Sequence, residues 1–103
     1  MTSQTLAVLG GAFLLAGGAI IVAGPASFQQ YLAALFGAAG ALLLAIPGVD
    51  PAWGFAAFLV SNVGWLCFAK QRGHWGLIGQ QLVFLLTSLV GIWNWWLGPV
   101  LLG

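Results

Sequence analysis

Charged residues are what this sequence lacks most. Among its 103 residues only Asp50, Lys70 and Arg72 are formally charged, which is 3% of the chain, whereas 62% are hydrophobic. A soluble domain needs roughly a quarter of its residues charged to cover its surface. The mean hydropathy of +1.10 agrees with this deficit. The composition therefore excludes a water-soluble domain and predicts an all-α integral membrane protein with the lipid bilayer as its solvent.

The shortage of reactive side chains argues against several functions. Asp50 is the only acid, so a catalytic pair of carboxylates is absent. The strong metal ligands are Asp50, Cys67 and His74, which are too few for a metal cage. Two basic residues do not make a patch for nucleic acid. We therefore expect no enzymatic activity, no metal, no cofactor and no nucleic-acid partner.

Four apolar runs predict four transmembrane helices in a single membrane domain. They cover about residues 6–23, 28–46, 52–69 and 75–97. The runs are separated by Gly24-Pro25, by a turn at 47–51 and by the polar cluster 70–74, and a Gly98-Pro99 break follows the last. No lysine or arginine precedes the first run, which favours a retained span over a cleaved signal sequence.

The first two spans have strips of small residues and are predicted to be packing helices. Such strips let a neighbouring helix approach closely within lipid. The strips are Gly10 with Gly17 and Gly24, Gly11 with Gly18, and Ala33 with Gly37, Ala41 and Ala45. Lys70 and Arg72 predict the orientation, because short cytoplasmic loops carry the excess of positive charge. The loop 70–74 is therefore expected in the cytoplasm, and the termini and the Asp50 turn outside.

The fourth span has one polar face. At about 100° per residue, its polar, glycine and aromatic positions fall in an arc about 140° wide. These positions are Gln80, Gln81, Phe84, Thr87, Ser88, Gly91, Asn94 and Trp95. Interhelical hydrogen bonding is one explanation, and a solute pathway is the other. The number of amides and hydroxyls favours the pathway, because packing would need fewer.

The third span supports a pathway. Phe55, Phe58, Asn62 and Trp65 recur at three and four residues, on one helix face. Aromatic side chains beside an amide can stack a flat ring while the amide bonds to its edge. Ordinary packing of the phenylalanines is the alternative. Trp65 and Trp95 are the tryptophans that share a face with an amide, whereas Trp53, Trp75, Trp93 and Trp96 are expected to be interfacial anchors.

The segments 61–65, 72–76 and 80–95 resemble the PnuC-type nicotinamide riboside transporters. The shared features are Trp-Gly loops and a transmembrane helix that ends with a glycine followed by closely spaced aromatics. The resemblance covers about residues 31–97. It implies that the last three spans form a three-helix bundle like that of the SWEET and SemiSWEET transporters, and that two copies of the chain enclose a route. The family members have seven spans in one chain, so this chain corresponds to a half-size version.

The resemblance also implies the residues that hold the solute. By position these are Asn62, Trp65, Gln81, Ser88, Asn94 and Trp95, and Phe58, Gln80 and Phe84 join them on the two helix faces. The leading hypothesis is an inner-membrane homodimer that facilitates diffusion of a small neutral or ring-bearing metabolite, such as a nicotinamide riboside-like vitamin, a nucleoside or a sugar. The alternatives are an accessory subunit of a larger membrane complex and a phage-type holin.

Overall fold

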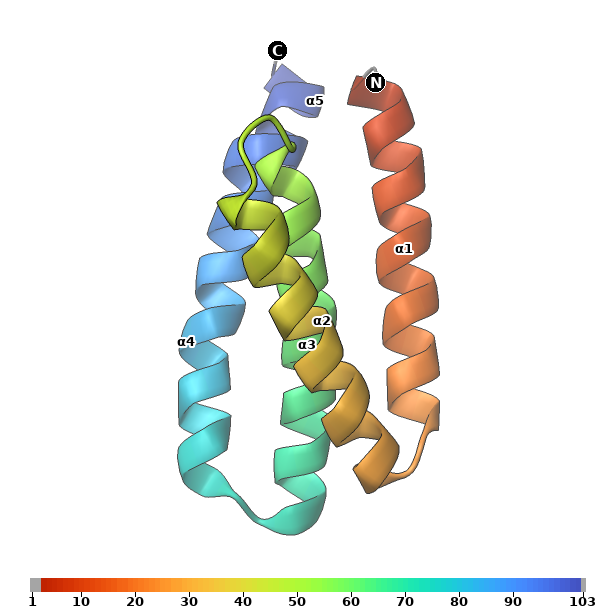
Figure 1. The fold of residues 1–103 in the computed structure, drawn as a ribbon, viewed down its shortest axis with the longest axis vertical. Coiled ribbons are helices and arrows are strands. Elements are labelled where there is room, and N and C mark those ends of the chain that lie inside the picture. Colours follow the sequence, from red (N-terminus) through yellow and green to blue (C-terminus); the bar gives the residue numbers. More distant parts are fainter. Residues whose placement is uncertain (1–2, 103) are drawn as a thin grey trace.

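The computed structural model describes residues 3–102, and within them the chain is helical without strands (Figure 1). The helices are α1 (Ser3–Ala23), α2 (Ala26–Ala45), α3 (Pro51–Arg72) and α4 (Trp75–Ile92), followed by a π-helical turn η1 (Trp93–Leu97) and α5 (Gly98–Leu102). The expected all-α fold with four long helices is confirmed. Both ends of the chain and the α2–α3 loop lie at one end of the bundle in Figure 1, and the other two turns lie at the opposite end.

Three of the described helices are long and apolar enough to cross a membrane. They are Ala26–Ala45, Pro51–Arg72 and Trp75–Leu102, and α1 adds a shorter apolar stretch, Ala7–Ala23. The 22 residues of α3 extend about 33 Å at about 1.5 Å per residue. This length matches a hydrocarbon layer about 30 Å thick. The helices are therefore compatible with a membrane protein.

Local residue choices set where α3 begins and ends. Asp50 is its N-cap, and its Oδ1 accepts a hydrogen bond of 3.0 Å from the Ala52 N–H. Pro51 follows at the first helical position, where the missing N–H is tolerated. Gly73 ends the helix with φ of +72°, a left-handed conformation that glycine adopts without strain. The only acid of the chain is therefore a helix cap in the α2–α3 turn.

Helix α3 is the centre of the bundle, and α2, α4 and α1 all pack on it. Its approach to α2 depends on glycines, because a Cβ at Gly64 would lie 2.8 Å from the Ala33 Cβ and one at Gly54 would lie 2.6 Å from Leu44. Ser61 Oγ adds a hydrogen bond of 2.6 Å to the Ala33 carbonyl. The expected strip of small residues on α2 is correct only in part. Ala41 and Ala45 are exposed, and the contact row continues through Gly40 and Leu44 instead.

Helix α1 uses one of its two glycine strips for packing within the chain. A Cβ at Gly10 would lie 2.7 Å from the Trp96 ring, and one at Gly17 would lie 3.2 Å from Val60. Gly11 and Gly18 face open space. The expectation of a packing helix is therefore confirmed for the Gly10 strip, which fits α1 against the rest of the bundle.

The fourth span does not end at Gly98-Pro99, contrary to the sequence-based expectation. The Gly98 N–H bonds to the Trp93 carbonyl five residues back, and this wide turn carries the helix on to Leu102. A Cβ at Gly98 would lie 2.6 Å from the same carbonyl oxygen, so glycine is needed there. Pro99 is the second residue of α5 and directly follows this wide turn.

The π-helical turn also changes which tryptophan faces the core. It accommodates an extra residue, so the residues that follow are rotated relative to a regular α-helix. Trp96 is consequently buried with Ala52 and Ile92. The expectation that Trp96 is an interfacial anchor is therefore wrong.

Candidate functional site: an aromatic and amide cavity on α3

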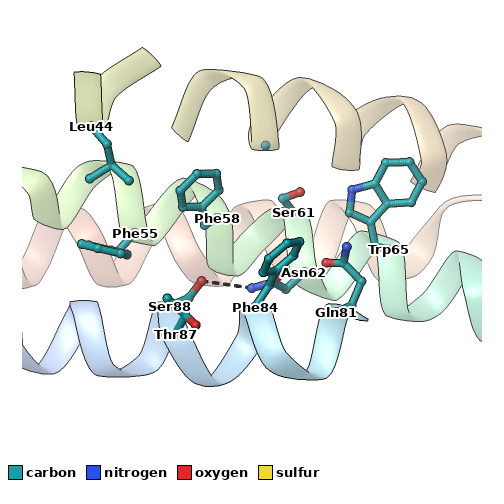
Figure 2. A pocket seen from close by; sticks show the side chains of 11 residues that line it. Leu44, Phe55, Phe58, Ser61, Asn62, Trp65, Gln81, Phe84, Thr87 and Ser88 are labelled. Carbon is teal, nitrogen blue, oxygen red and sulfur yellow. Dashed lines mark hydrogen bonds between the residues drawn. The ribbon is translucent and has the colours of Figure 1, made fainter. Parts of the chain in front are cut away.

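A cavity of about 400 Å³ lies between α2, α3 and α4 (Figure 2). Helix α3 forms its floor, and α2 and α4, which have almost no contact with each other, form its walls. Its volume is within the range of small-molecule sites. The lining residues are Gly37 and Leu44 from α2; Phe55, Phe58, Ser61, Asn62 and Trp65 from α3; and Gln81, Phe84, Thr87 and Ser88 from α4.

Helical spacing explains how α3 contributes to both the floor and the core. Phe55, Phe58, Asn62 and Trp65 follow at three and four residues and line the cavity. Residues on the other sides of α3 are mostly small and buried, such as Gly54, Ala57 and Gly64. Because these small residues let α2 approach closely, the larger aromatic side chains are left to occupy the side toward the cavity.

Asn62 and Ser88 connect the two helices that the sequence analysis singled out. Asn62 Nδ2 donates a hydrogen bond of 3.1 Å to Ser88 Oγ, and the two residues are 3% and 2% exposed. The bond joins the middle of α3 to α4. The cavity therefore has a polar centre at the midpoint of α3, where unpaired polar groups would be costly in lipid.

Gln81 is the polar lining residue that the fold leaves without a partner. It is 5% exposed, and its Oε1 is buried with no hydrogen bond. Leaving a buried acceptor unsatisfied costs about 1–3 kcal/mol. In Figure 2 its carboxamide points toward the Trp65 indole. Such an unsatisfied group in a cavity is typical of a position that a ligand or an ordered water completes.

The walls are aromatic, and the cavity lining carries no charged residue. The Phe55 ring fills the space over Gly91, where a Cβ would overlap it. At the other end, Trp65 meets Phe68 edge to face with ring centroids 5.9 Å apart. Phe68 in turn stacks with His74 and lies 5.9 Å from the Arg72 guanidinium carbon. Contrary to the expected loop 70–74, Lys70 and Arg72 belong to the last turn of α3. Trp65 is therefore supported through Phe68 by this last turn and by His74 after it.

Six of the predicted site residues line the cavity, and three do not. The six are Phe58, Asn62, Trp65, Gln81, Phe84 and Ser88. Gln80, Asn94 and Trp95 are exposed outside it. Gln80 precedes Gln81 by one residue, and about 100° of helical rotation turns it outward. Asn94 and Trp95 belong to the π-helical turn, which breaks the regular spacing used to place them on the face of Ser88.

Five further lining residues were not among the predicted solute-binding residues. Phe55 and Thr87 had been placed on the two helix faces by their spacing, and Ser61 is next to Asn62 in the sequence. Gly37 belongs to a small-residue strip that was assigned to packing alone. Nothing in the sequence marked Leu44 as a lining residue, because it is one of several leucines in an apolar run. It reaches the cavity only because α2 crosses α3.

Within the described residues, no three histidine, cysteine, aspartate or glutamate side chains come together as a metal site. Comparison with protein-family models, curated proteins and solved structures found no match to this chain.

Proposed function

We propose that this protein is a small membrane transporter that facilitates diffusion of an uncharged, ring-bearing metabolite. The observation that carries the proposal is the cavity of about 400 Å³ lined by Phe58, Trp65 and Phe84 together with the amides of Asn62 and Gln81. Aromatic rings offer stacking surfaces, and amides both donate and accept hydrogen bonds. A vitamin, a nucleoside or a sugar has the size and neutral polarity that such a site accommodates.

The absence of charge in the cavity lining supports facilitated diffusion. The lining residues include no acid that could relay a proton or bind sodium. A neutral site suits a neutral solute, which can leave as readily as it enters. The solute then moves down its own gradient, and consumption inside the cell makes uptake directional.

A homodimer is part of the proposal. Helices α2 and α4 have almost no contact with each other, so none of the helices within residues 3–102 closes the cavity on that side. A second copy would supply the missing wall. The resemblance to PnuC and SemiSWEET transporters supports the same arrangement, with α2, α3 and α4 as one three-helix bundle. We also propose the cytoplasmic membrane as the location, with α1 as a fourth span and the loop 70–74 inside.

Uptake into reconstituted vesicles tests the proposal. Purified protein in liposomes is offered labelled uridine, adenosine and a hexose, and empty liposomes are the control. We expect saturable uptake of at least one solute without an ion gradient. If the vesicles accumulate none of them, the transport proposal is contradicted.

Chemical cross-linking in the same vesicles tests the oligomeric state. A cross-linked dimer of this chain is expected. A chain that stays monomeric, and that co-purifies in stoichiometric amount with another membrane protein, would favour the accessory-subunit alternative instead.

A further inference from the structure

The cavity contains one amide side chain that forms no hydrogen bond within the described residues. Five lining side chains carry an amide or a hydroxyl, and four of them are engaged within the chain. Asn62 bonds to Ser88, Ser61 to the Ala33 carbonyl, and Thr87 to the Val83 carbonyl. The fifth is Gln81, which is 5% exposed and forms no side-chain hydrogen bond with any described residue.

Helix packing does not explain this glutamine. A side chain that associates helices bonds across the interface, as Asn62 does with Ser88. Gln81 is equally buried, yet its amide is directed into the cavity toward Trp65 (Figure 2). A leucine would fill the same position without an unsatisfied acceptor. The amide is therefore explained better by a bound molecule than by the fold.

A free carboxamide recognises a particular chemical pattern. It presents an acceptor oxygen and a donor nitrogen side by side in one plane. Glutamine and asparagine use this pair to form two hydrogen bonds with a flat ring that has a donor and an acceptor on neighbouring atoms. A 180° flip of the amide exchanges the oxygen and the nitrogen, so the pair fits either order of donor and acceptor on the ring.

The surroundings of Gln81 match such a ring. Trp65 and Phe84 line the same cavity on either side of the Gln81 amide in Figure 2 and offer aromatic faces for stacking. The opposite end of the cavity is apolar, with Leu44, Phe55 and Phe58. The lining residues include no charged side chain that would pair with an ionised ligand.

We propose that Gln81 binds the edge of an uncharged planar heterocycle that carries an N–H next to a C=O, as in a lactam. Trp65 stacks on the ring, and the apolar end of the cavity holds its hydrocarbon portion. This inference rests on the proposed transport function and narrows its substrate class. It excludes a sugar as the recognised part of the solute, because a sugar has no flat donor–acceptor edge.

A matched pair of probes tests this recognition. Quinazoline-2,4-dione has two ring N–H groups beside carbonyls, and its 1,3-dimethyl derivative has the same ring without them. Their dissociation constants are measured by titration calorimetry with the full chain in detergent. We expect the parent dione to bind about ten to a hundred times more tightly, because methylation removes both N–H donors and leaves the Gln81 Oε1 buried without one. The 1-methyl derivative, which keeps one N–H between two carbonyls, is expected to bind like the parent.

Replacing Gln81 tests whether this residue causes the tighter binding of the parent dione. Gln81→Met keeps the length of the side chain and removes both hydrogen-bonding groups, so the two diones should then bind within about twofold of each other. If this variant does not fold, the three probes on the wild-type protein decide the question. Equal binding of the parent and dimethyl diones, binding of neither at millimolar concentration, or a preference that survives in Gln81→Met would overturn the inference.

The outcome separates this inference from the transport proposal. Uptake of a hexose together with equal binding of the parent and dimethyl diones would leave transport standing and contradict the recognition by Gln81. Binding of the parent dione by Gln81 without any solute uptake would support recognition and contradict transport.

Discussion

Asn62 donates a hydrogen bond of 3.1 Å to Ser88 and thereby joins α3 to α4 at the centre of the cavity. Both side chains are buried, so each depends on the other for its hydrogen bond. The same contact supports the fold and forms part of the polar surface that a solute would meet. Its energetic contribution can therefore be measured apart from transport.

A double-mutant cycle measures this contact. Ser88→Ala leaves the Asn62 amide buried without its acceptor, and Asn62→Leu removes the donor. We expect the double variant to lose less free energy of unfolding than the sum of the single variants, with a coupling of about 0.6–2 kcal/mol as for other bonds between membrane helices. Reversible unfolding in detergent gives the values. Additive losses would show that the two residues do not interact.

Two adjacent glycines on α1, Gly10 and Gly11, allow a matched test of how α1 packs on the bundle. Gly10→Ala would place a methyl 2.7 Å from the buried Trp96 ring, and Gly11→Ala would place one in open space. We expect the first to reduce the free energy of unfolding by about 1–3 kcal/mol. The second should raise it by about 0.5–1 kcal/mol, because alanine is the better helix former. Equal effects in thermal unfolding would mean that α1 does not pack through the Gly10 strip.

Gly91 and Phe55 form a second packing relationship at the edge of the cavity. A methyl at Gly91 would overlap the Phe55 ring. Gly91→Ala is expected to lower the melting temperature and to push this ring into the cavity, and Phe55→Leu should restore much of the lost stability. Gly79→Ala on the same helix, which meets no neighbour, is the control. A neutral Gly91→Ala would show that the ring has room to move.

Much of the fold follows from the sequence because lipid and helix geometry limit the choices. Apolar runs and the breaks at Gly24-Pro25, 47–51 and 70–74 predicted the four long helices to within a few residues. The polar face of the last span correctly brought Gln81 and Ser88 to one cavity with Asn62. These residues lie in regular helix, where a 100° step per residue holds.

The errors have specific physical causes. Asn94 and Trp95 were misplaced because the π-helical turn depends on a hydrogen bond from the Gly98 N–H to the Trp93 carbonyl, which no residue pattern predicts. The glycine and proline there looked like a helix end. Leu44 joins the cavity only because α2 crosses α3 through glycine contacts, and such crossings depend on tertiary packing. Sequence periodicity describes one helix at a time, and it does not tell which faces meet.

The proposed orientation predicts which side of the membrane the α3–α4 loop occupies. His74→Cys, made with Cys67→Ala, places a single thiol in the exposed loop beside Lys70 and Arg72. We expect a membrane-impermeant maleimide to label it in inside-out vesicles and not in intact spheroplasts. Val49→Cys in the opposite turn should show the reverse. Labelling of His74→Cys in intact spheroplasts would show that the topology is opposite to the proposed one.

Solute uptake by matched glutamine and asparagine variants tests the central claim most directly. Asn62→Leu and Gln81→Leu change the cavity, whereas Gln30→Leu changes an exposed glutamine of α2 away from it. All are reconstituted at equal density and assayed with the uncharged solute that the wild-type protein carries, beginning with uridine. Uptake should fall to the level of empty vesicles for the two cavity variants and stay at the wild-type rate for Gln30→Leu. Wild-type uptake by all three would contradict a path through this cavity.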